Sequence, residues 1–246
     1  KPFLLRVYEA HIALAEYDEV GADKLYHMAR SFGFGMPTSE FFAGEENGRL
    51  LKPYELKRDD RTLKTMGFGH AVSVTPIQMA MAYAAVANGG VLMEPIIVLE
   101  GRDAQDSVVE KRAPTPVRRV ISESTASTIR SMLYRVVNSG TAKKVVSKKI
   151  PDVLFGGKTG TADKGQTGDV VVSFVCFAPA DDPQVAILVG VDDPPGQYRG
   201  GGVLAAPIAK EVMELTLEYL NVEPQYTESE LESVSHTTPS LVGKKL

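Results

Sequence analysis

The residues with the clearest chemical potential form one short run, Gly157-Lys158-Thr159-Gly160-Thr161. In a strand, side chains alternate between two faces, so Thr159 and Thr161 share a face and can offer two hydroxyls to one carboxylate. Gly160 has no side chain, so a substrate backbone can approach the strand closely. The Lys158 ammonium can fix an anionic substrate and bias nearby proton transfers, and a backbone N–H can stabilise an oxyanion. The run therefore predicts a strand that lines an acyl-transfer site.

Two other interpretations of this run stay open on the residues alone. Gly157-Lys158-Thr159 matches the end of the phosphate loop GxxxxGK[ST], but that loop requires glycine where the chain has Asp152. A phosphate loop also requires a following helix whose N-terminus meets the phosphate, whereas a strand pattern follows here. The remaining interpretation is a Gly/Thr-rich turn before a hairpin, with no chemical role.

The elements that must position this run follow it in the sequence. Two β-branched runs, Val170–Phe177 and Val185–Val191, are separated by a short turn and predict an antiparallel hairpin. Gly200-Gly201-Gly202 then predicts a flexible hinge. A helix from about Ala205 to Leu220 comes next, and its apolar positions include Ile208, Val212, Leu215 and Tyr219.

The first half of the chain is predicted to be mainly helical. One helix ends near Arg30, a second covers Ile77 to Ala87 after the capping pair Thr75-Pro76, and a third covers Ser122–Val137. The stretch Met36–Thr62 is rich in Gly, Pro and charge and predicts a long surface excursion. Helices, then a hairpin, then a helix packed back on it predict an α+β fold with an antiparallel sheet and helices on its faces.

The composition excludes several classes of protein. The 246 residues are 43% hydrophobic and 24% charged, as in ordinary globular chains, and the net charge of −4 argues against a general nucleic-acid binder. The single cysteine, Cys176, excludes an intrachain disulfide and predicts a buried small hydrophobe. The four histidines form no HxxxH or HExxH pair, which argues against a histidine-built metal site. We expect no metal and no cofactor. The uncharged run Ala71–Met93 is interrupted by Pro76 and by Asn88-Gly89-Gly90 and is expected to lie in the core.

Lys158-Thr159-Gly160 is also a signature of penicillin-binding proteins and serine β-lactamases. From about residue 21 to about residue 220, the chain resembles the C-terminal part of class B penicillin-binding proteins, the D,D-transpeptidases that cross-link peptidoglycan. The runs that carry the resemblance, in order, are Gly21-Ala22-Asp23-Lys24-Leu25-Tyr26, Phe32-Gly33-Phe34-Gly35, Gly67-Phe68-Gly69-His70, Val74-Thr75-Pro76-Ile77-Gln78-Met79-Ala80, Ala84-Ala85-Val86-Ala87-Asn88-Gly89-Gly90, Ser139-Gly140-Thr141-Ala142, Gly157-Lys158-Thr159-Gly160-Thr161-Ala162, Gly200-Gly201-Gly202 and Ala205-Ala206-Pro207-Ile208.

The resemblance implies an incomplete domain of the penicillin-binding transpeptidase fold and a role for each residue of the run. Lys158 would be catalytic, and Thr159, Gly160 and Thr161 would bind the substrate, with the Thr161 N–H as one oxyanion donor. The implied chemistry is acyl transfer through a serine ester, with a lysine as proton acceptor. Implied partners are peptidoglycan stem peptides, β-lactams and other cell-wall synthesis proteins. The implied location is the extracytoplasmic face of the cell membrane, through an anchor outside this chain.

The chain departs from this family in two motifs. It contains no Ser-x-x-Lys, since Ser139 is followed at that spacing by Ala142 and Ser147 by Ile150, and it contains no Ser-x-Asn. One explanation is that the chain is a fragment of a transpeptidase, which would be inactive alone because it lacks the nucleophilic serine. The other is a non-catalytic module that binds or senses muropeptides. A third hypothesis, a β-lactamase or β-lactam sensor, is disfavoured by the excursion at 36–62 and by the end of the chain.

The sequence predicts three regions. By the resemblance, residues 1–220 are expected to form the C-terminal part of a transpeptidase domain. Residues 221–236 are acidic and Ser/Thr-rich, which predicts a linker. Residues 237–246 contain Pro239-Ser240-Leu241-Val242-Gly243, which resembles the start of a PASTA repeat. This ending favours a sporulation- or division-type enzyme of Gram-positive bacteria.

Overall fold

The computed structural model describes residues 10–39, 44–58, 60–66, 69, 71–139, 154–164, 168–196 and 200–222. The chain divides into two compact units, Lys1–Ile129 and Arg130–Leu246. The predicted linker, apart from residues 221 and 222, and the predicted PASTA-like segment lie outside the described residues, so both stay predictions. The run Ser139-Gly140-Thr141-Ala142 also lies outside them, apart from Ser139 at a helix end.

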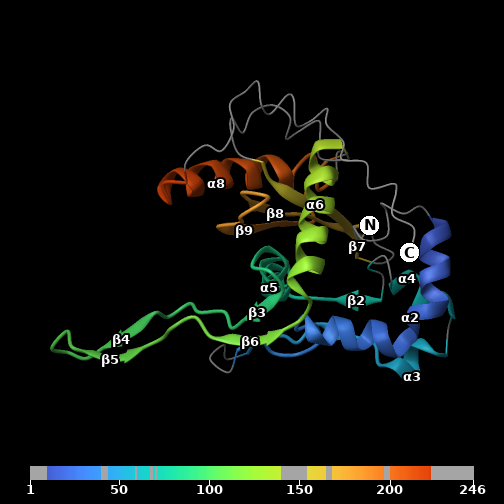
Figure 1. Cartoon of the computed structure of the whole chain (residues 1–246), viewed down its shortest axis with the longest axis horizontal. Helices are drawn as coiled ribbons and strands as arrows, with labels where there is room; N and C mark the ends of the chain where they lie inside the picture. Colours follow the sequence, from blue (N-terminus) through green and yellow to red (C-terminus); the bar gives the residue numbers. More distant parts are fainter. Residues whose placement is uncertain are drawn as a thin grey trace. The chain divides into compact units, whose positions relative to one another are not determined.

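The first unit contains helices and short antiparallel strand pairs (Figure 1). Its helices are α2 (Ala10–Ser31), α3 (Pro53–Leu56), α4 (Asp60–Met66) and α5 (Pro76–Ala87). Its strands pair as β1 (Arg49–Leu50) with β2 (Val72–Ser73), β3 (Val91–Met93) with β6 (Pro116–Arg119), and β4 (Glu100–Arg102) with β5 (Val108–Lys111). Helix α6 (Glu123–Ser139) begins in this unit and ends in the second.

Local hydrogen bonds explain where the predicted helices begin. At α5, the Thr75 hydroxyl accepts from the Gln78 N–H, the Gln78 carbonyl oxygen of the side chain accepts from the Thr75 N–H, and Pro76 takes the first helical position. At α6, the Ser122 hydroxyl accepts from the Thr125 N–H. The three predicted helices of the first half are confirmed, and α2 extends further toward the N-terminus with a kink at Gly21, whose φ is 63°.

The prediction of a surface excursion over 36–62 is wrong in part. This stretch contains β1, α3 and the start of α4, and Leu56 is fully buried in a small core with Ala22 and Met66. The elements are too short to produce a hydrophobic period, so the Gly and Pro content dominates the pattern. The side chain of Gln78, 1% exposed, donates to the carbonyls of Met36 and Asn47 at 2.8 and 3.0 Å and ties this stretch to α5.

Gln78→Ala is therefore expected to lower the free energy of unfolding by about 1–2 kcal/mol, because it removes a buried side chain that donates to two carbonyls of the loop. Urea denaturation of the variant and the wild type measures this difference. Gln105→Ala, in the exposed turn between β4 and β5, is the matched control and should change stability by less than about 0.5 kcal/mol. Equal effects of the two substitutions would contradict a role for Gln78 in tying down the loop.

The second unit is built on a three-stranded antiparallel sheet of order β7-β8-β9 (Figure 1). The strands are β7 (Gly156–Asp163), β8 (Val170–Ala178) and β9 (Val185–Asp192), and helix α8 (Ala205–Tyr219) lies across one face. The register runs without a bulge, from Gly156 opposite Phe177 to Asp163 opposite Val170. The predicted hairpin, the helix after it and the α+β fold class are confirmed.

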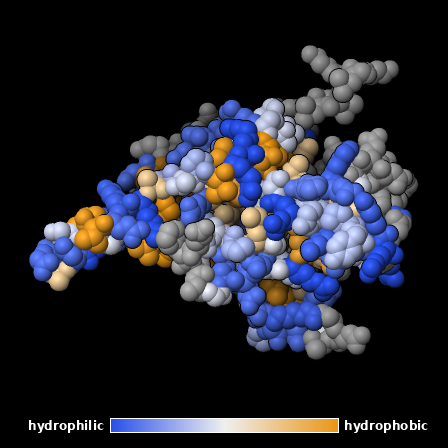
Figure 2. Space-filling view, turned by 90° about the horizontal axis from the view of Figure 1, so that it is seen from below, coloured by the Kyte–Doolittle hydropathy of each residue, from blue (hydrophilic) through white to orange (hydrophobic). Residues whose placement is uncertain are grey.

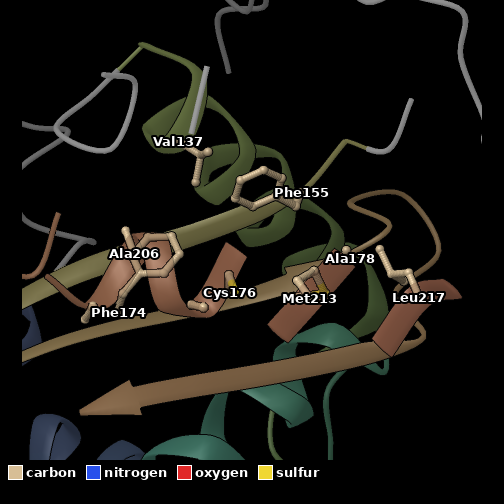
Figure 3. Packing of buried hydrophobic residues seen from close by; sticks show 10 residues of the cluster. Val137, Phe155, Phe174, Cys176, Ala178, Ala206, Met213 and Leu217 are labelled. Atoms are coloured by element: carbon tan, nitrogen blue, oxygen red, sulfur yellow. The ribbon is translucent and has the colours of Figure 1, made fainter. Parts of the chain in front are cut away.

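The main core of this unit lies between α8 and the sheet (Figure 3). Strand β8 contributes Phe174, Cys176 and Ala178, and α8 contributes small residues near its start and Met213 and Leu217 further on. Val137 of α6 and Phe155 complete the cluster. Complete burial of a side chain such as Phe174 stabilises the fold by about 1.5–3 kcal/mol, so this core fixes the sheet that carries the chemical run.

The apolar residues singled out in α8 by sequence lie on its exposed side. Ile208, Val212, Leu215 and Tyr219 are exposed, Tyr219 at 84%, so they do not form the face that packs on the sheet. The buried row is instead Ala205, Ala206, Ala209, Met213 and Leu217. Alanines allow the helix to approach the sheet closely. The size of the apolar side chains therefore does not identify the buried face of this helix.

The hairpin of β4 and β5 carries exposed apolar residues, among them Val108 and Val109 (Figure 2). Figure 2 shows hydrophobic surface on this hairpin between hydrophilic groups.

In the described ranges, no helix combines the length and the apolarity needed to cross a membrane. The run 71–93 instead places Ala82, Ala85 and Val86 of α5 in buried positions, as predicted.

Candidate functional site

The predicted chemical run forms β7, a strand at the edge of its sheet. It pairs with β8 on one side, and no other described strand pairs with it. The run continues as a strand to Asp163 rather than entering a helix, so the phosphate-loop interpretation is excluded. The interpretation as a turn is excluded for the same reason, because the whole run is extended.

The two glycines before Lys158 have a packing reason. A Cβ on Gly156 would lie 2.5 Å from the ring of Phe177, and one on Gly157 would lie 2.6 Å from the carbonyl oxygen of Val175. Neither position has room for a side chain while β7 keeps its register on β8. These glycines therefore hold the chemical run against the sheet.

The register assigns the functional side chains to faces. Thr159 lies opposite Phe174 and Thr161 opposite Val172, so both threonines are on one face of the sheet. Lys158, opposite Val175, is on the other face. Thr159 is half-buried and Thr161 is exposed. Two hydroxyls, one of them in contact with solvent, are thus repeated along one face of the strand.

The ammonium of Lys158 reaches around the strand to its neighbour. The side chain is 7% exposed, and its Nζ donates to the Thr159 carbonyl at 2.7 Å and to the Thr159 hydroxyl at 3.4 Å. A buried cation has lost most of its hydration and interacts strongly with any anion placed beside it. The positive charge of the site is therefore held next to Thr159.

The direction of the β7 backbone adds the Thr161 N–H as a donor at the edge of the strand away from β8. A Cβ built on Gly201 would lie within 2.6 Å of the carbonyl oxygens of both Gly160 and Ser173. The two oxygens of this pair are therefore close together, which requires that the backbone N–H and C=O of Gly160 point toward β8. Neighbouring residues of a strand direct these groups to opposite sides, so those of Thr159 and Thr161 face the open edge. The Lys158 ammonium and the Thr161 N–H therefore lie along the edge that β8 leaves uncovered.

This edge offers a cation, two hydroxyls and a backbone N–H to a single extended ligand. Such a set suits a carboxylate and a carbonyl oxygen that becomes negatively charged during reaction. No group of three His, Cys, Asp or Glu side chains in the described part of the chain is placed to hold a metal ion. The cation, the hydroxyls and the N–H of the edge suit binding and charge stabilisation.

Cys176 lies in the core on β8, opposite Gly157, and is 1% exposed. Burial raises the pKa of its thiol to about 12, so the reactive thiolate is scarce at neutral pH. Its placement agrees with the predicted buried hydrophobe.

We expect Cys176 of the native protein to resist a disulfide reagent at pH 8, because the thiol is both protonated and covered. In guanidinium chloride the unfolded chain should react with one equivalent of the reagent and release one equivalent of thiolate, since it has one cysteine. Absorbance of the released thiolate follows both reactions. Rapid labelling of the native chain would show that the α8–sheet core is not closed.

Two residues of the site were not found by sequence reasoning. The Ser173 hydroxyl lies 2.5 Å from where a Cβ on Gly160 would be, and Gly201 is buried against Gly160 rather than forming the predicted flexible hinge. Both contacts depend on the strand register and on how α8 returns to the sheet. No local pattern at either residue reports that geometry.

The chain matches known proteins over most of its length. Residues 7–214 match the family model described as penicillin binding protein transpeptidase domain. The stage V sporulation protein D of Bacillus subtilis is 39% identical over 219 residues, which are 87% of this chain and 33% of that protein. The chain thus spans about a third of the length of the curated relatives it matches.

Solved structures are similar as well. The transpeptidase domain of Burkholderia pseudomallei penicillin-binding protein 3 is matched with a TM-score of 0.72 and 30% identity, over 87% of this chain and 62% of that one. Penicillin-binding protein 3 of Mycobacterium tuberculosis, complexed with aztreonam, is matched with a TM-score of 0.73 and 28% identity, over 87% of this chain and 51% of that one.

Proposed function

Because the chain belongs to the transpeptidase-domain family of penicillin-binding proteins, we propose that it carries the substrate-binding strand of a peptidoglycan D,D-transpeptidase. The observation that carries this proposal is β7, where the Lys158 ammonium lies 2.7 Å from the Thr159 carbonyl at the open edge of the sheet. Substrates of the longer protein would be peptidoglycan stem peptides, and β-lactams would compete for the same site.

Four consecutive residues of β7, from Lys158 to Thr161, have a role in this proposal. The Thr159 and Thr161 hydroxyls and the Lys158 ammonium bind the carboxylate of the stem peptide, and charge-assisted hydrogen bonds of this kind contribute about 1.5–3 kcal/mol each. The peptide backbone lies along the edge beside Gly160. The Thr161 N–H donates to the oxygen of the attacked carbonyl, where loss of one such donor costs about 10²–10³-fold in rate.

The nucleophile belongs to another part of the longer protein in this account. The family chemistry is acyl transfer through a serine ester, with a lysine as proton acceptor, and this chain contains no Ser-x-x-Lys. The coverage of about a third of the relatives is consistent with a serine supplied from outside the chain. Alone, the chain is expected to bind weakly and to form no acyl-enzyme.

The cellular setting follows the relatives. We place the longer protein at the extracytoplasmic face of the cell membrane, among the cell-wall synthesis proteins. The similarity to a stage V sporulation protein supports a sporulation- or division-type role. The PASTA-like ending at 237–246 is part of the same proposal.

The absence of Ser-x-x-Lys from this chain also supports a second candidate, a non-catalytic module that binds or senses muropeptides. Both candidates require that the edge of β7 bind an acyl-D-alanine carboxylate. They differ in whether a covalent bond forms.

The test is a transpeptidation assay on the full-length natural protein that contains this chain. A donor peptide ending in D-Ala-D-Ala and an amine acceptor should give a cross-linked product by mass spectrometry, and benzylpenicillin should abolish it. Binding of a muropeptide without product would select the second candidate. Rapid hydrolysis of benzylpenicillin would indicate a β-lactamase, and neither binding nor reaction would overturn both candidates.

A further inference from the structure

Gly201 is packed against the middle of the chemical run. A Cβ added to it would lie 2.2 Å from the Ser173 carbonyl oxygen, 2.6 Å from the Gly160 carbonyl oxygen and 3.2 Å from the Gly160 nitrogen. Gly160 and Ser173 are directly paired between β7 and β8. The neighbours are backbone atoms of a paired sheet, so they cannot rotate away as the end of a side chain would.

The first turn of α8 also fixes the backbone of Gly201. The Gly201 carbonyl accepts from the N–H groups of Ala205 and Ala206 at 3.1 and 2.9 Å. Ala205 and Ala206 are fully buried in the core that contains Phe174 of β8. Figure 3 shows Ala206 and Phe174 in this core. Gly201 therefore lies between a fixed helix start and the backbone of β7, with no room for a side chain.

From this contact we infer that Gly201 is a positioning residue for the transpeptidase site, an inference that rests on the proposed function. A side chain at Gly201 must either push the paired backbone of Ser173 and Gly160 or lift the first turn of α8. Gly160 lies between Thr159 and Thr161, so a shift of Gly160 moves both hydroxyls away from the bound carboxylate. Small displacements of positioning groups cost up to about 10²-fold in rate.

The chain supplies a matched control in the preceding residue. A Cβ on Gly200 would meet nothing within 4 Å, and neither Gly200 nor Gly201 has the positive φ that only glycine adopts easily. Gly200→Ala and Gly201→Ala are therefore the same chemical change in one segment. They differ in whether the new methyl group meets the sheet.

The experiment compares two acylating probes on the full-length natural protein. Benzylpenicillin carries the carboxylate that Thr159 and Thr161 would bind, and its methyl ester does not. Gly201→Ala should lower the second-order rate of acylation by benzylpenicillin at least about tenfold. The rate with the methyl ester should fall by a smaller factor, because a displaced Thr161 N–H affects both probes whereas displaced hydroxyls affect only the probe with a carboxylate. Gly200→Ala should change both rates less than about twofold.

Three results would overturn the inference while leaving the proposed function intact. They are equal losses with both probes, as plain unfolding would give, no loss in Gly201→Ala, or an equal loss in Gly200→Ala. A wild-type protein that neither probe acylates would instead refute the proposed function, and the inference with it.

Hydrogen exchange provides a second measurement if Gly201→Ala is too unstable for rate assays. Peptides that cover β7 should exchange faster in Gly201→Ala than in Gly200→Ala, and peptides that cover β9 should exchange alike. Unchanged exchange in β7, or equally faster exchange in β7 and β9, would contradict a local effect on the strand.

Discussion

Replacing Lys158 with alanine should lower the rate at which benzylpenicillin acylates the full-length protein by about 10²–10⁴-fold. The substitution removes a buried ammonium that lies beside Thr159 at the open edge of β7, where anion binding and proton transfer would both depend on it. Stopped-flow or quenched acylation with mass detection measures the rate. Unchanged folding, checked by circular dichroism, separates lost chemistry from lost structure.

Lys164 is the matched control for Lys158. It follows β7 in sequence, is more exposed, and forms an ion pair with Asp192 of β9, a hydrogen bond that raises the pKa of Lys164 above its ordinary value. Lys164→Ala removes the same charge from the same sheet, just after the last residue of β7, without touching the edge site. It should leave acylation within about twofold of wild type, since exposed ion pairs contribute little. Comparable losses in the two variants would mean that net charge, and not the site, governs acylation.

Gly160→Ala is the second large effect that we expect. The new Cβ would lie 2.5 Å from the Ser173 hydroxyl, so the pair must separate or rotate. We expect a loss of about 1–3 kcal/mol in the free energy of unfolding. Because Thr159 and Thr161 flank the displaced residue, acylation by benzylpenicillin should fall about 10–100-fold. Urea denaturation and acylation kinetics of the full-length variant measure the two effects.

A double variant decides why this position is glycine. Ser173→Ala leaves a Cβ that an added Gly160 methyl would meet at 3.8 Å, an ordinary contact. Gly160→Ala with Ser173→Ala should therefore recover most of the stability and most of the acylation rate. If the double variant recovers stability but not the acylation rate, Gly160 is needed so that the substrate backbone can approach the strand closely.

The chemical run and its strand were accessible from sequence because both have short-range patterns. Alternation along β7 placed Thr159 and Thr161 on one face, and the β-branched runs after it predicted the hairpin that the register confirms. The capping pair Thr75-Pro76 likewise located the start of α5. In each case, residues within a few positions of one another determine the local structure.

Features that depend on distant contacts were not accessible in this way. Ser173 matters because the register of β7 on β8 places it opposite Gly160, and Gly201 matters because the chain returns to the same pair before α8. No neighbouring residue in the sequence reports either contact. The packing face of α8 does not follow from its larger apolar residues, because the buried row begins with alanines while Leu215 and Tyr219 are exposed. Leu56 was assigned to a surface excursion because its core partners Ala22 and Met66 lie in other elements.

Intact-mass spectrometry of the full-length natural protein after incubation with benzylpenicillin tests the central claim most directly. The account predicts a mass increase of one benzylpenicillin, located by peptide mapping on a serine outside residues 1–246, and loss of this adduct in Lys158→Ala at short times. A folded, full-length protein that gains no mass at saturating benzylpenicillin would contradict the assignment of β7 to a transpeptidase site.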